Sequence, residues 1–78
     1  MNQDYIKLEK TCACIASLEH TNDNDESKLC EFIERHEYQV DVYIYLERSH
    51  YKVYQNGGWN DFVILDEKEF KENFKLIE

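Results

Sequence analysis

The sequence predicts a small α+β protein in which residues 1–78 form a single domain with the element order β-α-β-β-β-α. Three observations lead to this fold class. The length of 78 residues allows one domain. Residues 38–47 alternate apolar and polar side chains, and with the strands after them they predict a central antiparallel β-meander. Two further segments, one before the meander and a short one near the C-terminal end, carry apolar residues at helical spacing.

Residues 4–18 fit two periodicities, so both a strand and a helix are possible there. The apolar residues at period two are Ile6, Leu8, Cys12, Cys14, Ala16 and Leu18. The residues near helical spacing are Tyr5, Leu8, Cys12, Ile15 and Glu19. Because threonine and isoleucine are enriched in strands, we favour a strand at least for residues 11–18.

A polar loop over residues 19–27 leads into the first predicted helix. Asp25 or Ser27 can cap it, because both side chains accept hydrogen bonds from free amides at a helix start. The helix is expected from Ser27 to His36. Its buried stripe would consist of the residues at positions i, i+3, i+4 and i+7, namely Leu29, Phe32, Ile33 and His36.

The predicted meander begins with residues 38–47. One face of this strand is aliphatic (Val40, Val42, Ile44, Leu46), and the other carries acids and tyrosines (Asp41, Tyr43, Tyr45, Glu47). The chain then turns at residues 48–50 and returns over residues 51–55. Asn56-Gly57-Gly58 predicts a hairpin, since these residues tolerate the positive φ that such a turn needs. Residues 59–65 form the next expected strand.

The C-terminal segment predicts a capped helix and a final strand. Asp66 is the expected N-cap, and Phe70 and Phe74 lie four residues apart on one helical face. Leu76 and Ile77 are expected to form a short edge strand.

No catalytic or cofactor signature stands out, and we expect no enzyme activity, no cofactor and no metal. The possible zinc ligands do not have the usual paired spacing; they are Cys12, Cys14, Cys30, His20, His36 and His50. Three cysteines make no disulfide framework, and neither a signal peptide nor an apolar run of about 18 residues is visible. We therefore expect a cytoplasmic protein that does not bind membranes.

The acidic residues are concentrated in one part of the chain. The net charge is −8, which disfavours direct binding to DNA or RNA and favours basic proteins. Residues 19–41 carry eight acids against Lys28 and Arg35, a net charge of −6. On a helix, carboxylates three or four residues apart lie about 5–6 Å from each other, near the spacing of nucleic-acid phosphates. The predicted partner-binding residues are Glu19, Asp23, Asp25, Glu26, Glu31, Glu34, Glu37 and Asp41. The alternative is that these acids only solvate a loop and a helix start.

Tyr43 and Tyr45 form a second candidate surface, because tyrosine contributes a large contact area with a polar tip. They are expected either to pack under another segment or to mediate a homodimer or adaptor contact. The adaptor or antitoxin-like module that would bind through this face is the alternative function.

The chain resembles the small acidic proteins with which phages take over a host. The resemblance rests on the short length, the absence of proline, the cluster of acids and the ending Asp66-Glu67-Lys68-Glu69-Phe70. It is similar to DNA-mimic inhibitors, a class that includes uracil-DNA glycosylase inhibitors and some anti-CRISPR proteins, and most of all to a phage inhibitor of the histone-like nucleoid protein HU. The resemblance implies a noncovalent inhibitor, in the host cytoplasm, that blocks a DNA-binding surface as a homodimer.

Overall fold

The computed structural model describes residues 4–55 and 58–77, and over these residues the protein is mostly β. The elements are β1 (Ile6–Cys14), β2 (Leu18–Thr21), β3 (Leu29–Phe32), β4 (Glu37–Ile44), β5 (Ser49–Tyr54), β6 (Phe62–Asp66), α1 (Glu67–Asn73) and β7 (Phe74–Ile77). The predicted α+β class with two helices is therefore wrong. Within the described residues no helix has the length and apolar character needed to cross a membrane.

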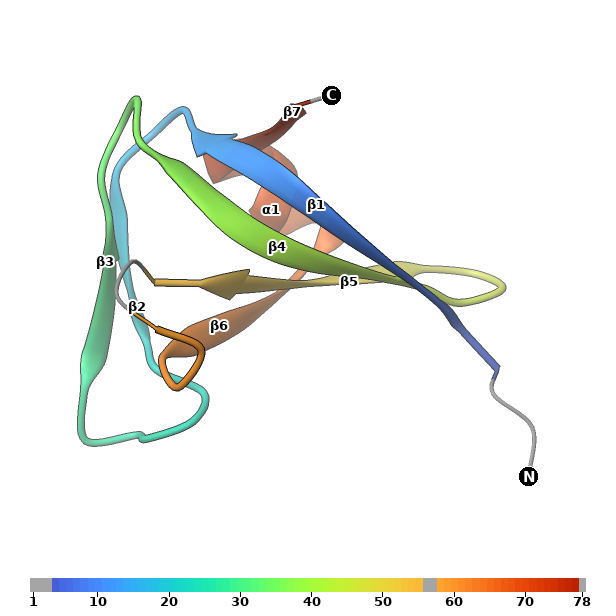
Figure 1. The fold of residues 1–78 in the computed structure, drawn as a ribbon, viewed down its shortest axis with the longest axis horizontal. Helices are drawn as coiled ribbons and strands as arrows, with labels where there is room; N and C mark the ends of the chain where they lie inside the picture. Colours follow the sequence, from blue (N-terminus) through green and yellow to red (C-terminus); the bar gives the residue numbers. More distant parts are fainter. Residues whose placement is uncertain (1–3, 56–57, 78) are drawn as a thin grey trace.

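Five strands form one antiparallel sheet in the order β6-β5-β4-β1-β7, and β2 and β3 form a separate hairpin. β1 and β4 run side by side as the longest pair, from Ile6 opposite Ile44 to Ala13 opposite Glu37. In Figure 1 the hairpin stands at the left across the end of the sheet, while the N-terminal part of β1 extends to the lower right. The hairpin and α1 therefore cover only part of the sheet.

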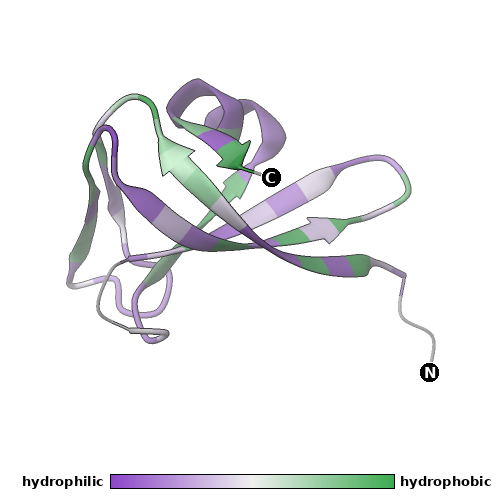
Figure 2. Cartoon of the chain, turned by 45° about the horizontal axis from the view of Figure 1, so that its top comes forward, coloured by the Kyte–Doolittle hydropathy of each residue, from purple (hydrophilic) through white to green (hydrophobic). Residues whose placement is uncertain are grey.

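The core lies between one face of the sheet, the hairpin and α1. Alternation places every second residue of each strand on this face, and Figure 2 shows the resulting bands of hydrophobic and hydrophilic residues. Each layer of this core contributes buried side chains, which include Cys12, Cys14, Val40, Val53 and Val63 of the sheet, Cys30 and Phe32 of the hairpin, and Phe70 of α1.

The predicted helix cap at Asp66 and the C-terminal edge strand are confirmed, but α1 ends at Asn73 and Phe74, predicted within the helix, is the first residue of β7. The Asp66 carboxylate accepts a hydrogen bond of 2.8 Å from the Glu69 amide and so caps α1. Phe70 stacks on Tyr51 with a centroid distance of 4.0 Å and on Phe74 with 5.4 Å. These contacts hold the short helix on the sheet, and β7 then forms the edge strand beside β1.

The helix predicted from Ser27 to His36 does not exist; residues 29–32 form strand β3 instead. Leu29 and Ile33, which should lie on the buried stripe of that helix, are 58% and 51% exposed. Only Cys30 and Phe32 point into the core, which is the period-two pattern of a strand. The i, i+3, i+4 spacing of Leu29, Phe32 and Ile33 was thus compatible with a helix without specifying one.

Several predicted boundaries also shift. The strand favoured at least over residues 11–18 is confirmed for residues 11–14 and extends back to Ile6, but β1 ends at Cys14. Residues 19–21, predicted as part of a loop, join Leu18 in a second strand, β2. The strand predicted over 38–47 ends at Ile44. Leu46 and Glu47 lie in the following turn, which is closed by a 2.8 Å hydrogen bond from the Tyr45 amide to the Arg48 carbonyl. β6 begins at Phe62, three residues after the predicted start. The predicted Asn56-Gly57-Gly58 hairpin turn has its first two residues outside the described range.

Candidate functional site

The outer face of the β2–β3 hairpin places two glutamates directly opposite each other. Glu19 and Glu31 are both exposed, and they are partners in the register of the hairpin. Side chains at such positions have Cβ atoms about 4.5–5.5 Å apart, and like charges there repel each other. The hairpin therefore places two like-charged side chains at directly opposite positions, which does not favour its folding.

A shallow groove runs beside this pair. Its volume is about 460 Å³, and it is lined by Ser17, Leu18, Glu19, Glu31, Phe32 and Ile33. The exposed Leu29 and Ile33 flank Glu31, on the same outer surface of the hairpin. Carboxylates next to exposed aliphatic groups suit a partner that is cationic and partly apolar.

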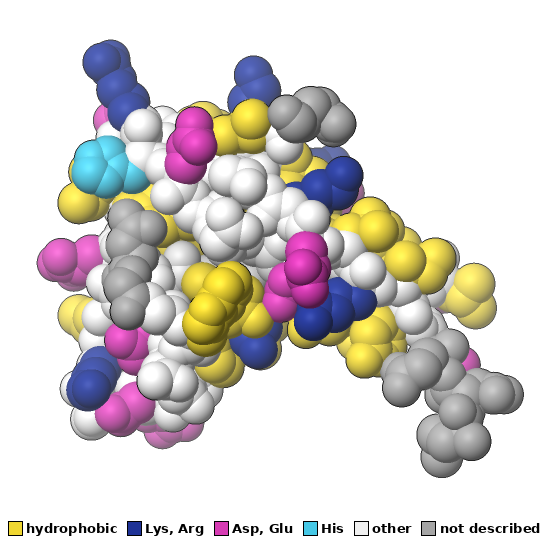
Figure 3. Space-filling model, in the orientation of Figure 1, with side chains coloured by type: hydrophobic (Ala, Val, Ile, Leu, Met, Phe, Trp, Pro, Cys, Tyr) yellow, Lys and Arg dark blue, Asp and Glu magenta, His cyan; other side chains and the backbone are white. Residues whose placement is uncertain are grey.

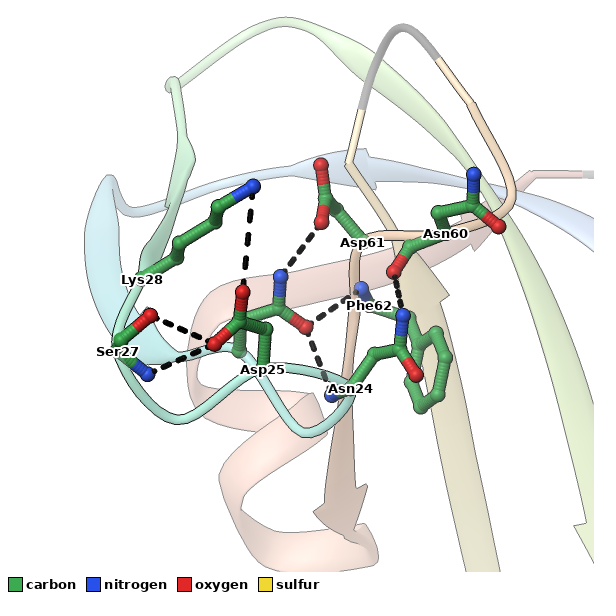
Figure 4. A network of polar contacts seen from close by, with 8 residues as sticks. Asn24, Asp25, Ser27, Lys28, Asn60, Asp61 and Phe62 are labelled. Carbon is green, nitrogen blue, oxygen red and sulfur yellow. Dashed lines mark hydrogen bonds and ion pairs between the residues drawn. The ribbon is translucent and has the colours of Figure 1, made fainter.

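The loop after β2 is fixed to β6 by a buried asparagine. The Asn22 Oδ1 accepts hydrogen bonds from the amides of Asn24 at 2.8 Å and Phe62 at 3.4 Å, and its Nδ2 donates to Asp61 at 2.6 Å (Figure 4). A buried amide satisfied in this way fixes the position of the loop. The hairpin tip is thus anchored to the sheet.

Two predicted acids have local partners in this loop. The Asp25 carboxylate accepts bonds from the hydroxyl and the amide of Ser27, which lower the pKa of Asp25, and Lys28 lies 4.0 Å away (Figure 4). The Asp23 carboxylate accepts a 2.7 Å bond from the Ile64 amide, and the Asp23 amide donates to the Phe62 carbonyl at 2.8 Å. Both acids are therefore used, at least in part, to shape the loop.

Glu34 and Glu37 continue the acidic surface at the other end of the hairpin. Both are exposed, Glu34 in the turn after β3 and Glu37 at the start of β4. The Ser17 hydroxyl accepts a 2.7 Å bond from the Glu34 amide, and Arg35 adopts a positive φ of 77° in the same turn. Figure 3 shows acidic side chains gathered at the left of the molecule, over the hairpin and its loop. Across the described parts of the chain, no ion pair involves Glu19, Asp23, Glu26, Glu31, Glu34 or Glu37.

Asp41, a predicted partner-binding residue, does not belong to this surface. It is only 7% exposed and lies on the opposite face of β4 from the core. The Tyr54 hydroxyl donates a 2.7 Å bond to it, and the Lys7 ammonium lies 3.9 Å away. Burial, together with this bond to Asp41, raises the pKa of Tyr54. Asp41 is therefore part of a polar cluster within the sheet.

Tyr43 and Tyr45 lie on the open face of the sheet, and neither the hairpin nor α1 covers them. Tyr5 packs against both, at centroid distances of 5.4 and 5.6 Å. Burial raises the pKa of Tyr43. The tyrosines and their neighbours line a depression of about 340 Å³ formed by Tyr43, Tyr45, His50, Lys52 and Ile64.

The same open face continues into a second aromatic group. Lys52 lies over the rings of Phe62 and Tyr54, at 4.2 and 5.2 Å from their centroids. Trp59 packs edge-on against Tyr54 at 4.7 Å, yet 67% of its surface is exposed. Lys52 thus lies among aromatic rings here, and no sequence pattern pointed to Lys52 or Trp59 as surface residues of this kind.

The three cysteines are buried and free of disulfides. Burial raises the pKa of Cys12 to about 12, so its thiol stays protonated at neutral pH. In the ranges 4–55 and 58–77, no group of three or more His, Cys, Asp or Glu side chains is arranged to hold a metal ion.

The structure thus brings most of the predicted acids onto one hairpin and separates Asp41 from them. It also exposes Leu29 and Ile33, which were assigned to the core. The alternation Leu29-Cys30-Glu31-Phe32 was the signal that could have placed Leu29 and Glu31 on one exposed face. No family model, curated protein or solved structure matches the chain.

Proposed function

We propose that this protein is a noncovalent inhibitor of phage type, whose acidic hairpin surface binds a basic nucleic-acid-binding protein of a bacterial host and blocks nucleic-acid binding. We define the acidic hairpin surface by six exposed acids and the half-buried Asp25; the six exposed acids are Glu19, Asp23, Glu26, Glu31, Glu34 and Glu37. The histone-like nucleoid protein HU is the partner that the resemblance to phage inhibitors suggests. The site of action would be the host cytoplasm, in keeping with three unpaired cysteines.

The observation that carries this proposal is the direct opposition of Glu19 and Glu31, neither of which forms an ion pair in the described chain. Such a pair is unfavourable in the free protein. A cationic partner relieves the repulsion and gains attraction at the same time, so the charge pair contributes more to binding than to folding.

The cross-strand geometry also supports mimicry of a phosphate backbone. The helix expected from the sequence is absent, but cross-strand glutamates are about as closely spaced as the acids on a helix turn would be, roughly 5 Å. The acids lie in the loop at the hairpin tip, at the glutamate pair between β2 and β3, and in the turn after β3. Such a strip would steer a basic protein at long range, as DNA does.

The test is competition between this protein and a DNA duplex for purified HU, followed by fluorescence anisotropy of the labelled duplex. We expect displacement of DNA at low salt. The affinity for HU should fall at least about tenfold between roughly 50 and 200 mM salt, because several charge contacts are screened. Glu19→Gln and Glu31→Gln should each weaken binding, and the double variant more so.

Glu72→Gln is the matched control, since it removes one charge from an exposed position on α1, outside the hairpin. It should change the affinity by less than about twofold. Binding that is independent of salt, or equally sensitive to the variants at positions 31 and 72, would contradict mimicry.

A second candidate function, an adaptor that binds through its open sheet face, is favoured by one specific observation. The exposed Trp59 and the depression beside Tyr43 and Tyr45 together form an aromatic surface. In that case Tyr43→Ala should abolish partner binding while Glu31→Gln leaves it unchanged. The same competition assay with these two variants separates the two functions.

A further inference from the structure

The N-terminal half of β1 has an open edge. β7 pairs with β1 only from Thr11 to Cys14, whereas β4 pairs with it from Ile6 to Ala13. Within the described chain, residues 6–10 therefore have a neighbouring strand on one side only. Figure 1 shows this part of β1 extending past β7 toward the N-terminus. An open edge of five residues is a template for another strand.

The opposite edge of the same sheet is closed. At the outer side of β6, Asp23 accepts a bond from the Ile64 amide and Asn22 accepts one from the Phe62 amide. The Asp23 amide also bonds to the Phe62 carbonyl. The protein thus protects one edge of its sheet with the hairpin loop and leaves the β1 edge available.

The direction of the free backbone groups follows from the ends of β1. The amide and carbonyl of Cys14 bond to His36 and Arg35, on the side of β4, while the Ile15 amide bonds to Asn73, on the side of β7. Successive residues of a strand bond to opposite sides, and the register with β4 is regular throughout. The amides and carbonyls of Lys7 and Glu9 therefore point out of the open edge, whereas those of Leu8 point to β4.

Lys7 and Glu9 favour one register for pairing between the β1 edges of two copies of the protein. In an antiparallel pair with a second copy centred on Leu8, Lys7 of each copy lies opposite Glu9 of the other. Opposite charges at such positions attract. Moving the centre to Lys7 or to Glu9 would place like charges directly opposite each other, which is unfavourable.

We propose that the protein forms a two-fold dimer by antiparallel pairing of the open β1 edges, with Leu8 on the axis. Lys7 and Glu9 of each copy exchange both backbone hydrogen bonds with Glu9 and Lys7 of the other. Leu8 meets its own copy on the opposite face, at the closer, non-hydrogen-bonded position. The pairing also covers part of Ile6 and Leu8, which are 61% and 38% exposed. This inference is independent of the proposed function.

Lysine on an edge strand often prevents such pairing, so the position of the Lys7 side chain decides whether the β1 edge is accessible. Its ammonium lies 3.9 Å from Glu9 and 3.9 Å from Asp41, over its own sheet. It therefore does not project from the edge in the way that would block an approaching strand. In the dimer it gains Glu9 of the second copy as an additional partner.

The experiment is sedimentation equilibrium of the full chain and its variants over about three decades of concentration. We expect a concentration-dependent dimer, because so short an interface belongs to the weak class. Glu9→Lys should raise the dimer dissociation constant at least about fivefold, since two attractive pairs become repulsive. Lys7→Glu should do the same. A mixture of the two variants should form a heterodimer, because every pair is then of opposite charge.

This mixing experiment separates an interface effect from a folding defect, since two misfolded variants would not restore each other. Glu72→Lys, the same charge change on α1, should leave the dissociation constant unchanged. Amide exchange gives the register independently: the amides of Lys7 and Glu9 should become protected as the concentration rises. The proposal is overturned by a chain that stays monomeric, or by a dimer that tolerates Glu9→Lys and leaves both amides unprotected.

Discussion

Glu19 and Glu31 are each unremarkable as exposed strand residues, and only their opposition in the hairpin gives them a combined effect. Glu31→Gln removes the repulsion without changing the shape of the side chain. We expect the free energy of unfolding to rise by about 0.2–1 kcal/mol, measured by urea denaturation. The same substitution should weaken binding to a basic partner. A substitution that raises the free energy of unfolding and lowers the affinity for the partner is the expected result for a residue whose role is binding.

Glu26→Gln serves as the comparison for this effect. Glu26 is exposed in the loop and has no cross-strand partner, so its neutralisation should alter stability less than that of Glu31. If Glu31→Gln destabilises the protein, the repulsion between Glu19 and Glu31 contributes little to stability. The proposed function would then lose its main support, which is the unfavourable opposition of these two glutamates.

At the scale of elements, local capping chemistry was readable from the sequence and short periodic patterns were not. Asp66 and Phe70 predicted α1 correctly, because a cap and a buried apolar residue agree there, whereas Phe74 lies just beyond the helix in β7. Residues 27–36 carry a helix-like spacing and a possible cap as well, yet they form β3 and a turn. Tertiary contacts decide this case, since Cys30 and Phe32 reach the core from alternate positions of a strand.

The cap of α1 makes a quantitative prediction. Asp66→Ala should lower the free energy of unfolding by about 1 kcal/mol, because the Glu69 amide loses its acceptor at the start of a helix of only seven residues. Asp66→Asn keeps an acceptor and should cost much less. Urea denaturation of both variants gives the comparison. Equal stability of the two would show that the cap contributes nothing measurable.

At the scale of the molecule, the sequence predicted where the acids cluster but not what they do individually. Clustering followed from counting charges, and the hairpin does gather most of these residues. It could not be read from the sequence that Asp41 would be buried under the Tyr54 hydroxyl, or that Asp23 would seal β6. Both roles depend on residues more than ten positions away in the chain. The open β1 edge likewise depends on where β7 ends.

A dimer paired along β1 would carry two acidic hairpin surfaces on one particle, which leads to a prediction about multivalent ligands. The chain should bind long polylysine much more tightly than a short lysine oligomer, because the second hairpin then binds at a high effective concentration. Glu9→Lys should reduce this gain at least about tenfold while Glu72→Lys, with the same change in net charge, preserves it. Fluorescence anisotropy with labelled peptides of the two lengths measures both affinities. If Glu9→Lys and Glu72→Lys show the same gain in affinity for long over short peptide, pairing along β1 has no part in binding and each acidic hairpin surface acts as a single site. If only Glu19→Gln and Glu31→Gln lose binding to both peptides, the hairpin is still supported as the site of contact.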